Sequence, residues 1–153
     1  MKPVPPLAEF IVLIALMISL VAMTTDIMLA ALGIIAADLG QADPGQAHLI
    51  ISVLFAGFAL GQLVVGPLSD SFGRRPVIHF GYLAFCIGTL LCLFSTSFAA
   101  MLAGRVLQGL GMSGPRIIAV AIVRDGYAGR QMARIMSFVM AVFIIVPIIA
   151  PSI

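Results

Sequence analysis

The stretch "GPLSDSFGRRPV", which runs from Gly66 to Val77, decides how this chain folds. It places three charged residues, Asp70, Arg74 and Arg75, within six positions. The chain of 153 residues around it is 62% hydrophobic and only 9% charged, whereas about a quarter of the residues in a soluble domain are charged. So few charges cannot cover a surface that faces water, and we therefore expect the chain to fold in lipid.

The quoted stretch has the residues of a tight hairpin between two helices. Gly66 and Pro67 are expected to end the first helix. Gly73 can adopt a positive φ angle and reverse the chain at little steric cost. Pro76 suits the first turn of the second helix, where its missing N–H group is not needed. The two arginines before Pro76 are too polar to enter lipid, so they hold the hairpin at a membrane surface.

Apolar runs on both sides of the hairpin are long enough to cross a bilayer, for which a helix needs about 20 residues. Polar or turn-forming residues separate the runs, and the last run reaches the final residue. We treat the whole chain, residues 1–153, as one transmembrane helical bundle. The five predicted spans are residues 8–36, 47–68, 77–96, 99–123 and 132–153.

The distribution of basic residues predicts the orientation of the bundle, because Lys and Arg favour the cytoplasmic side. With the N-terminus inside, the two outer loops, residues 37–46 and 95–98, contain no Lys or Arg. The cytoplasmic side then carries six basic residues, Lys2, Arg74, Arg75, Arg124, Arg130 and Arg134. The quoted hairpin is therefore predicted to be cytoplasmic, in a multi-pass protein of the bacterial inner membrane.

Two motifs resemble one transporter family. The hairpin pattern G-x-L-x-D-x-x-G-R-R is similar to the loop between the second and third helices of the major facilitator superfamily. The segment "RVLQGLGMSG", residues 105–114, resembles the fourth-helix motif of its proton-driven exporters. The segments "TTDIMLAALGIIAADLG" and "IVRDGY" resemble the bicyclomycin/chloramphenicol type of drug:proton antiporter. The resemblance implies an all-α membrane protein whose five helices form most of one six-helix half of a major facilitator fold.

The resemblance also implies a conformational latch at the cytoplasmic surface. In the family, the loop aspartate and arginine control the change between inward-open and outward-open states. Carried over, Asp70 faces a helix of a second half of the transporter, and Arg74 pairs with Asp125 at the inner end of the fourth span. The latch residues implied in this sequence are Gly66, Asp70, Gly73, Arg74, Arg75 and Asp125.

Three charged residues lie inside predicted spans, where a charge usually faces a cavity or a partner. Counting about 1.5 Å per helical residue places Asp26 and Arg105 at matching depths, about 12 Å and about 10 Å below the outer surface. We expect the two to meet, either as a site for protons and substrate or as a static ion pair. Gln108, one turn from Arg105, either orients it or contacts substrate. Arg116 either lines an inner vestibule or reaches the inner headgroups.

Gly57 and Gly61, four residues apart in the second span, predict a close approach to another helix. No metal-ligand cluster and no pair of nucleophile and base indicates an enzyme, and neither a cofactor nor nucleic acid is expected. We expect proton-coupled efflux of small amphipathic drugs by a longer transporter of which this chain is a fragment that lacks the C-terminal half. The alternatives are a major facilitator carrier for a sugar or metabolite and a small self-associating exporter.

Overall fold

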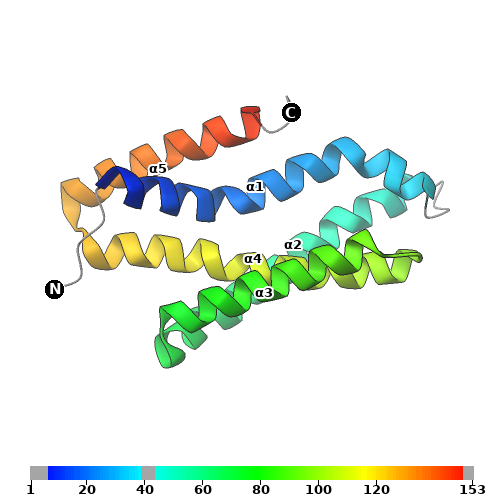
Figure 1. Cartoon of the computed structure of the whole chain (residues 1–153), viewed down its shortest axis with the longest axis horizontal. Coiled ribbons are helices and arrows are strands. Elements are labelled where there is room, and N and C mark those ends of the chain that lie inside the picture. The colour runs from blue at the N-terminus through cyan, green and yellow to red at the C-terminus, as the bar shows by residue number, and fades with distance from the viewer. Residues whose placement is uncertain (1–6, 39–43, 150–153) are drawn as a thin grey trace.

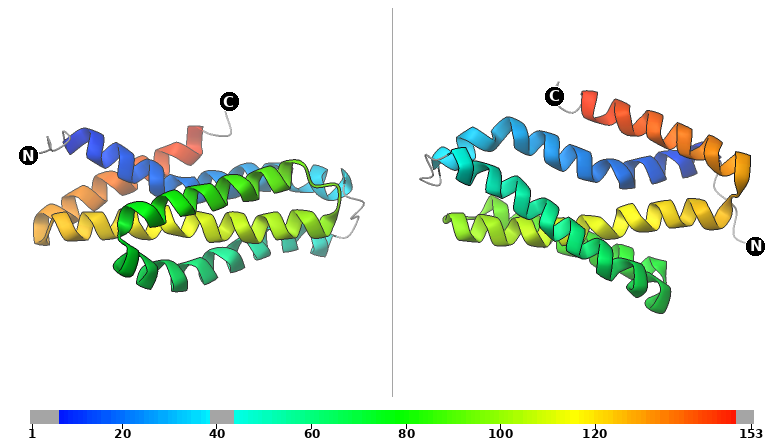
Figure 2. Two further views of the ribbon diagram at one scale, coloured as in Figure 1. Left: turned by 60° about the horizontal axis from the view of Figure 1, so that its bottom comes forward. Right: turned by 180° about the vertical axis from the view of Figure 1, so that it is seen from behind.

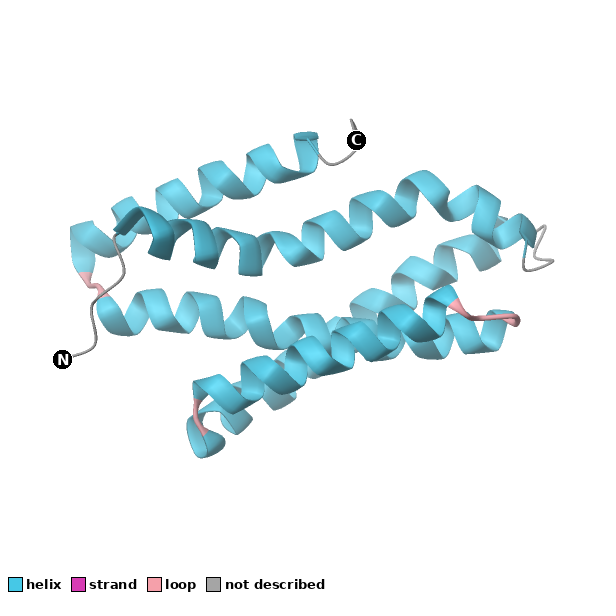
Figure 3. Cartoon of the chain, in the orientation of Figure 1, coloured by secondary structure: helices cyan, strands magenta, loops and turns pink. Residues whose placement is uncertain are grey.

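The protein is a bundle of five α-helices in the computed structural model, which describes residues 7–38 and 44–149. The helices are α1 (Leu7–Asp38), α2 (Pro44–Phe72), α3 (Arg74–Leu93), α4 (Phe98–Gly126) and α5 (Gly129–Ile149). The described residues outside them form short turns, and no strand occurs among the described residues (Figure 3). The five predicted spans correspond to these helices in order; residues 150–153 of the last span lie outside the described part.

Four of the helices are long and apolar enough to cross a bilayer, judged over the described residues. These segments are Leu7–Ile35, His48–Phe72, Arg74–Leu93 and Phe98–Gly126. Large apolar side chains on their outer faces are strongly exposed, for example Leu63 at 75% and Leu93 at 72%. Because apolar surface is unfavourable in water, this exposure fits a bundle surrounded by lipid.

Helix α2 runs further than the sequence predicted. We expected Gly66 and Pro67 to end it, but it continues through Pro67 to Phe72. A proline inside a helix removes one backbone hydrogen bond without fixing where the helix stops. The turn is made instead by Gly73, whose φ of 84° lies in a region that glycine enters freely. Pro76 lies in the first turn of α3, as predicted.

Helix α4 is the centre of the bundle. Of its most apolar stretch, 56% is buried, against 11% for α3. Figure 1 shows α3 in front of α4, and the view from behind in Figure 2 shows α2 crossing α4 on the opposite side. Helices α1 and α5 lie together along a third side of α4 (Figure 1). Arg105, which lies on α4, and the hairpin between α2 and α3 are therefore both positioned by this one helix.

Glycines allow α4 to touch its neighbours through backbone atoms. A methyl group added at Gly57 of α2 would overlap the Val106 carbonyl group of α4, and one added at Gly109 of α4 would overlap the Leu54 carbonyl oxygen of α2. On the α3 side, a methyl group at Gly81 would lie 2.8 Å from the Gly111 carbonyl oxygen. The close approach predicted from Gly57 and Gly61 is confirmed, and it extends to both sides of α4.

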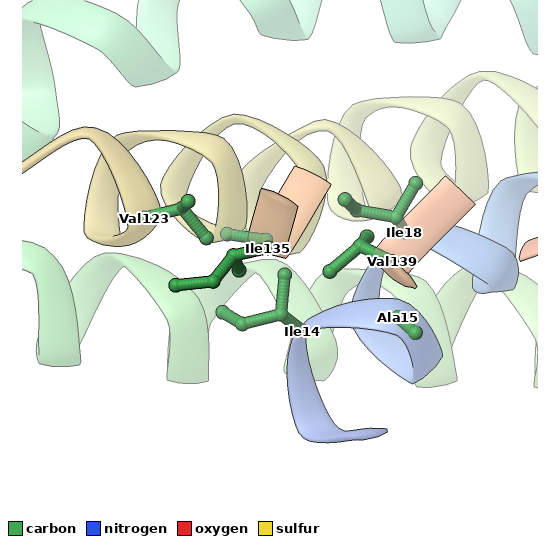
Figure 4. Close-up of a cluster of buried hydrophobic side chains, with 7 residues drawn as sticks. Ile14, Ala15, Ile18, Val123, Ile135 and Val139 are labelled. Atoms are coloured by element: carbon green, nitrogen blue, oxygen red, sulfur yellow. The ribbon is translucent and has the colours of Figure 1, made fainter. Parts of the chain in front are cut away.

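Apolar side chains join α1 and α5 to the centre. One cluster combines residues of α1, α4 and α5 (Figure 4): Ile14, Ala15, Ile18, Ala119, Val123, Ile135 and Val139. Nearer the other end of α1, Met28 and Leu32 pack with Ile50 of α2 and Met101 of α4. Helix α1 is therefore held against α4 at both ends, and this packing fixes which face of α1 meets the site.

The glycine contacts predict a specific stability difference. Gly57→Ala places a methyl group against a backbone carbonyl that cannot move alone, so α2 and α4 must separate; overpacking of this kind costs about 1–3 kcal/mol. Gly33→Ala is the control, because the space around Gly33 in α1 is open. Thermal unfolding of the purified protein in detergent should show a lower midpoint for Gly57→Ala alone. Equal midpoints for the two variants would contradict the backbone contact.

Candidate functional site

Arg105 of α4 is a buried cation inside a membrane-spanning segment. Its side chain is 8% exposed. Its Nη1 donates a hydrogen bond of 2.7 Å to Oε1 of Gln108, one helical turn away. The Nε of Arg105 is also buried and has no hydrogen-bond partner in the described structure. The guanidinium is thus fixed from one side, and one of its N–H donors is left unused.

Gln108 connects Arg105 to α3. While its Oε1 accepts from Arg105, its Nε2 donates a 2.9 Å hydrogen bond to the hydroxyl oxygen of Thr89. The Thr89 hydroxyl in turn donates to the Phe85 carbonyl oxygen at 2.8 Å. Both ends of the Gln108 amide are therefore engaged by the protein, which is the arrangement of a residue that orients Arg105. Of the two roles left open by the sequence, this geometry favours orientation.

Thr89 is the member of this network that the sequence analysis missed. It lies in the third span between Gly88 and Leu90, and the motifs did not include it. The available signal was a hydroxyl residue in an apolar helix next to a glycine. At Gly88 the α4 backbone lies close to α3, because an added methyl group there would meet the Gln108 backbone nitrogen and the Gly104 carbonyl oxygen.

The expected contact between Asp26 and Arg105 is not formed. The group of α1 that meets the Arg105 guanidinium is the Met28 sulfur, which lies against Nη2. Asp26 is half-buried, and it forms no ion pair within the described residues. The depth argument correctly brought α1 and α4 together here. It failed on direction, because two residues turn a helix by about 200° and send Asp26 and Met28 to different faces.

The predicted ion pair between Arg74 and Asp125 is confirmed. Arg74, the first residue of α3, contacts the carboxylate of Asp125 in the last turn of α4. The side chains are 31% and 57% exposed, and the Nη1 of Arg74 is buried without a partner in the described structure. This contact joins the α2–α3 hairpin to the end of α4.

The remaining latch residues lie in the α2–α3 hairpin region and do not extend this ion pair. Asp70 and Arg75 are exposed, and neither forms an ion pair within the described segments. Gly66 is half-buried inside α2, and Gly73 makes the turn. The structure therefore brings Arg74 and Asp125 together, whereas the Asp70 carboxylate contacts no cation among the described residues.

Arg116 lies about 16 Å along α4 from Arg105, at about 1.5 Å per residue. Its guanidinium carbon stands 5.7 Å from the centre of the Phe58 ring of α2, within the range of a cation–π interaction. The same side chain lines a cavity of about 310 Å³ together with Gln62 and Arg124. Of the two placements left open by the sequence, the structure supports the one in which Arg116 faces a cavity.

No group of three or more potential metal ligands occurs in the part of the chain that the structure describes. The polar groups of the site are a buried guanidinium, a buried amide and the hydroxyl of Thr89, a residue on the exposed side of α3. These groups can bind, orient and exchange hydrogen bonds with a ligand.

Comparison with known proteins assigns the family. Residues 12–153 match the Major Facilitator Superfamily. The chain belongs to this superfamily. Its members are transporters, so the major facilitator chain described here is a multi-pass membrane protein, and its five helices give the all-α architecture expected of this family.

Curated relatives of this major facilitator chain include multidrug resistance proteins called MdtL. Those of Salmonella paratyphi B and Salmonella newport are 39% identical over 126 residues, and that of Salmonella dublin is 38% identical over the same length. The matched segments cover 82% of this chain and 32% of each relative. The chain thus spans about a third of the length of the relatives it matches.

The hydrogen-bond chain predicts that Thr89 acts through its hydroxyl. Thr89→Val keeps the shape but leaves the buried Gln108 amide without its acceptor, which costs about 1–3 kcal/mol. Thr89→Ser keeps the hydroxyl and serves as the matched control. Chemical unfolding in detergent should place the valine variant below both the serine variant and the unmodified protein. Indistinguishable curves for valine and serine would show that the hydrogen bond is not formed.

Proposed function

We propose that this chain forms most of the first half of a proton-coupled exporter of small amphipathic compounds. The observation that carries the proposal is the buried Arg105 guanidinium, which has no carboxylate partner among the described residues and keeps one buried N–H unused. A charge inside a membrane is costly unless it faces a cavity or a partner. Since a static ion pair with Asp26 is not formed, the charge is better explained by a ligand or a partner that Arg105 meets during transport.

The comparisons support efflux as the direction of transport. The relatives are named as multidrug resistance proteins, and export from the cell is one way for a transporter to confer resistance. The segments that resemble drug:proton antiporters include the Arg105 motif itself. Because the matched segment covers 32% of each relative, we propose that a second bundle completes the transport path.

Asp26 is proposed as the proton-coupling group. It is the acidic residue placed in the middle of α1, away from the helix ends that carry Glu9 and Asp38. Its half-buried carboxylate lies two residues from Met28, which touches Arg105. A small rotation of α1 therefore changes the distance between carboxylate and guanidinium. Uptake of a proton by Asp26 in one state of the transporter, and its release in the other, would couple proton movement to export of the drug.

Neutralising Asp26 is expected to abolish coupled export. In the full-length transporter, Asp26→Asn removes the titrating group, so drug efflux from loaded cells should fall at least tenfold and no longer respond to a protonophore. Asp38→Asn, at the exposed end of the same helix, should keep the activity of the unmodified protein. Proton-driven export that survives in Asp26→Asn would remove this carboxylate from the mechanism, and absence of export by the unmodified protein would contradict the proposed function.

We propose that the Arg74–Asp125 contact is a latch between the hairpin and α4. It joins two segments that must move relative to each other if the end of α4 is to open. The exposed Asp70 is proposed to meet a helix of the second bundle, and Gly66, Gly73 and Arg75 to shape and hold the hairpin. The side of the bundle with this latch is proposed to face the cytoplasm, together with the N-terminus, in the bacterial inner membrane.

Breaking the latch is expected to change the rate of transport more than the fold. Arg74→Ala should reduce the maximal efflux rate several-fold with little change in the melting temperature, because an ion pair exposed to this degree contributes little to stability. Exchange of the two charges, Arg74→Asp with Asp125→Arg, should restore part of the rate. Arg130→Ala, an exposed arginine of α5, is the control. An unchanged rate in Arg74→Ala would exclude the latch.

A further inference from the structure

The cavity between α2 and α4 has a chemistry that the proposed function does not explain. One wall is α2, which contributes Gln62; Phe58, which contacts Arg116, lies one turn before Gln62 in the same helix. The other wall is α4, where Arg116, Val120 and Arg124 follow each other at intervals of four residues and so share one face. Two guanidinium groups and an amide thus line the cavity together with three apolar side chains, those of Ile117, Val120 and Ala121.

The charge of this cavity is positive and not neutralised by the described chain. Neither Arg116 nor Arg124 forms an ion pair within the described residues. The carboxylate next to Arg124 in sequence, Asp125, is occupied by Arg74. The Phe58 ring contacts Arg116 through its π face and is no strong hydrogen-bond acceptor, so the N–H groups of Arg116 remain available to another acceptor.

Resting on the proposed export function, we propose that this cavity binds the anionic group of amphipathic cargo. A carboxylate, sulfonate or phosphate accepts hydrogen bonds from arginine in a bidentate geometry. The apolar lining residues accommodate the hydrophobic part of the same molecule. The volume of about 310 Å³ is at the lower end of the range for small-molecule sites, so it suits the charged end of a ligand. Cations are disfavoured here by the two arginines.

A pair of dyes that differ in one charge tests the proposal. The probes are a zwitterionic rhodamine with a free carboxylate and its ethyl ester, and their binding to the full-length protein in nanodiscs of zwitterionic lipid is followed by fluorescence anisotropy. We expect the carboxylate dye to bind about tenfold more tightly than the ester, equivalent to about 1.4 kcal/mol. Equal affinities, a preference for the ester, or no binding of either dye would overturn the proposal.

Substitutions at Arg116 then test whether the preference for the carboxylate dye arises in this cavity. Arg116→Gln should remove the advantage of the carboxylate dye, while the cationic ester binds at least as tightly as before, and Arg116→Lys should keep most of the advantage. The matched control is Arg134→Gln, because Arg134 also stands over a phenylalanine, 5.9 Å from the Phe138 ring centre, but does not line the cavity. A preference that persists in Arg116→Gln would contradict the assignment, and retained ester binding shows that the variant has folded.

Two further measurements distinguish a lipid headgroup from cargo as the ligand, and test the anion site separately from the export function. Nanodiscs that contain phosphatidylglycerol test whether a lipid headgroup occupies the cavity; complete loss of dye binding there would reassign the cavity to lipid and overturn its role for cargo. Transport of both dyes into everted membrane vesicles tests export separately. Selective binding without transport would contradict the proposed function and leave the anion site standing. Transport of both dyes without selective binding would contradict the anion site and leave the proposed function standing.

Discussion

The close contact between the backbone of α4 and its two neighbours is the constraint on which the rest of the structure depends. In lipid, helices gain little from burying apolar side chains against each other, so their association relies on close packing and hydrogen bonds. Glycines on α2, α3 and α4 allow this packing: the neighbours of Gly57, Gly109 and Gly111 are main-chain atoms of a facing helix. A larger residue at any of these positions would push the helices apart.

This packing also explains where the polar network forms. Gly88 of α3 lies against the Gln108 backbone, so Thr89, the next residue, comes within hydrogen-bond distance of the Gln108 side chain. The hydrogen bond that orients Arg105 therefore depends on the same approach of α3 and α4 that the glycines permit. At the other end of α4, the hairpin that begins α3 brings Arg74 to Asp125. One helix thus carries a buried cation near one end and the ion pair near the other.

Much of this arrangement could be predicted from the sequence, because it follows from local properties. Long apolar runs located the helices, and the freedom of Gly73 to adopt a positive φ located the hairpin turn. Counting residues correctly brought α1 and α4 together at the depth of Arg105. The direction of a side chain around its helix is not local in this sense, since it depends on which face packs against a neighbour. For that reason the contact of Arg105 is Met28 rather than Asp26, and Thr89 was not found.

The approach of α3 to α4 can be measured directly with one introduced cysteine. A methyl group added at Gly104 would lie 2.8 Å from the Sγ of the native Cys92, close enough for a second sulfur to complete a disulfide with its S–S bond of about 2.05 Å. Under mild oxidation in the membrane, Gly104→Cys should form a disulfide with Cys92 and not with Cys86, which mass spectrometry of the digested protein distinguishes. Absence of this bond, or a bond to Cys86, would contradict the packing on which the site depends.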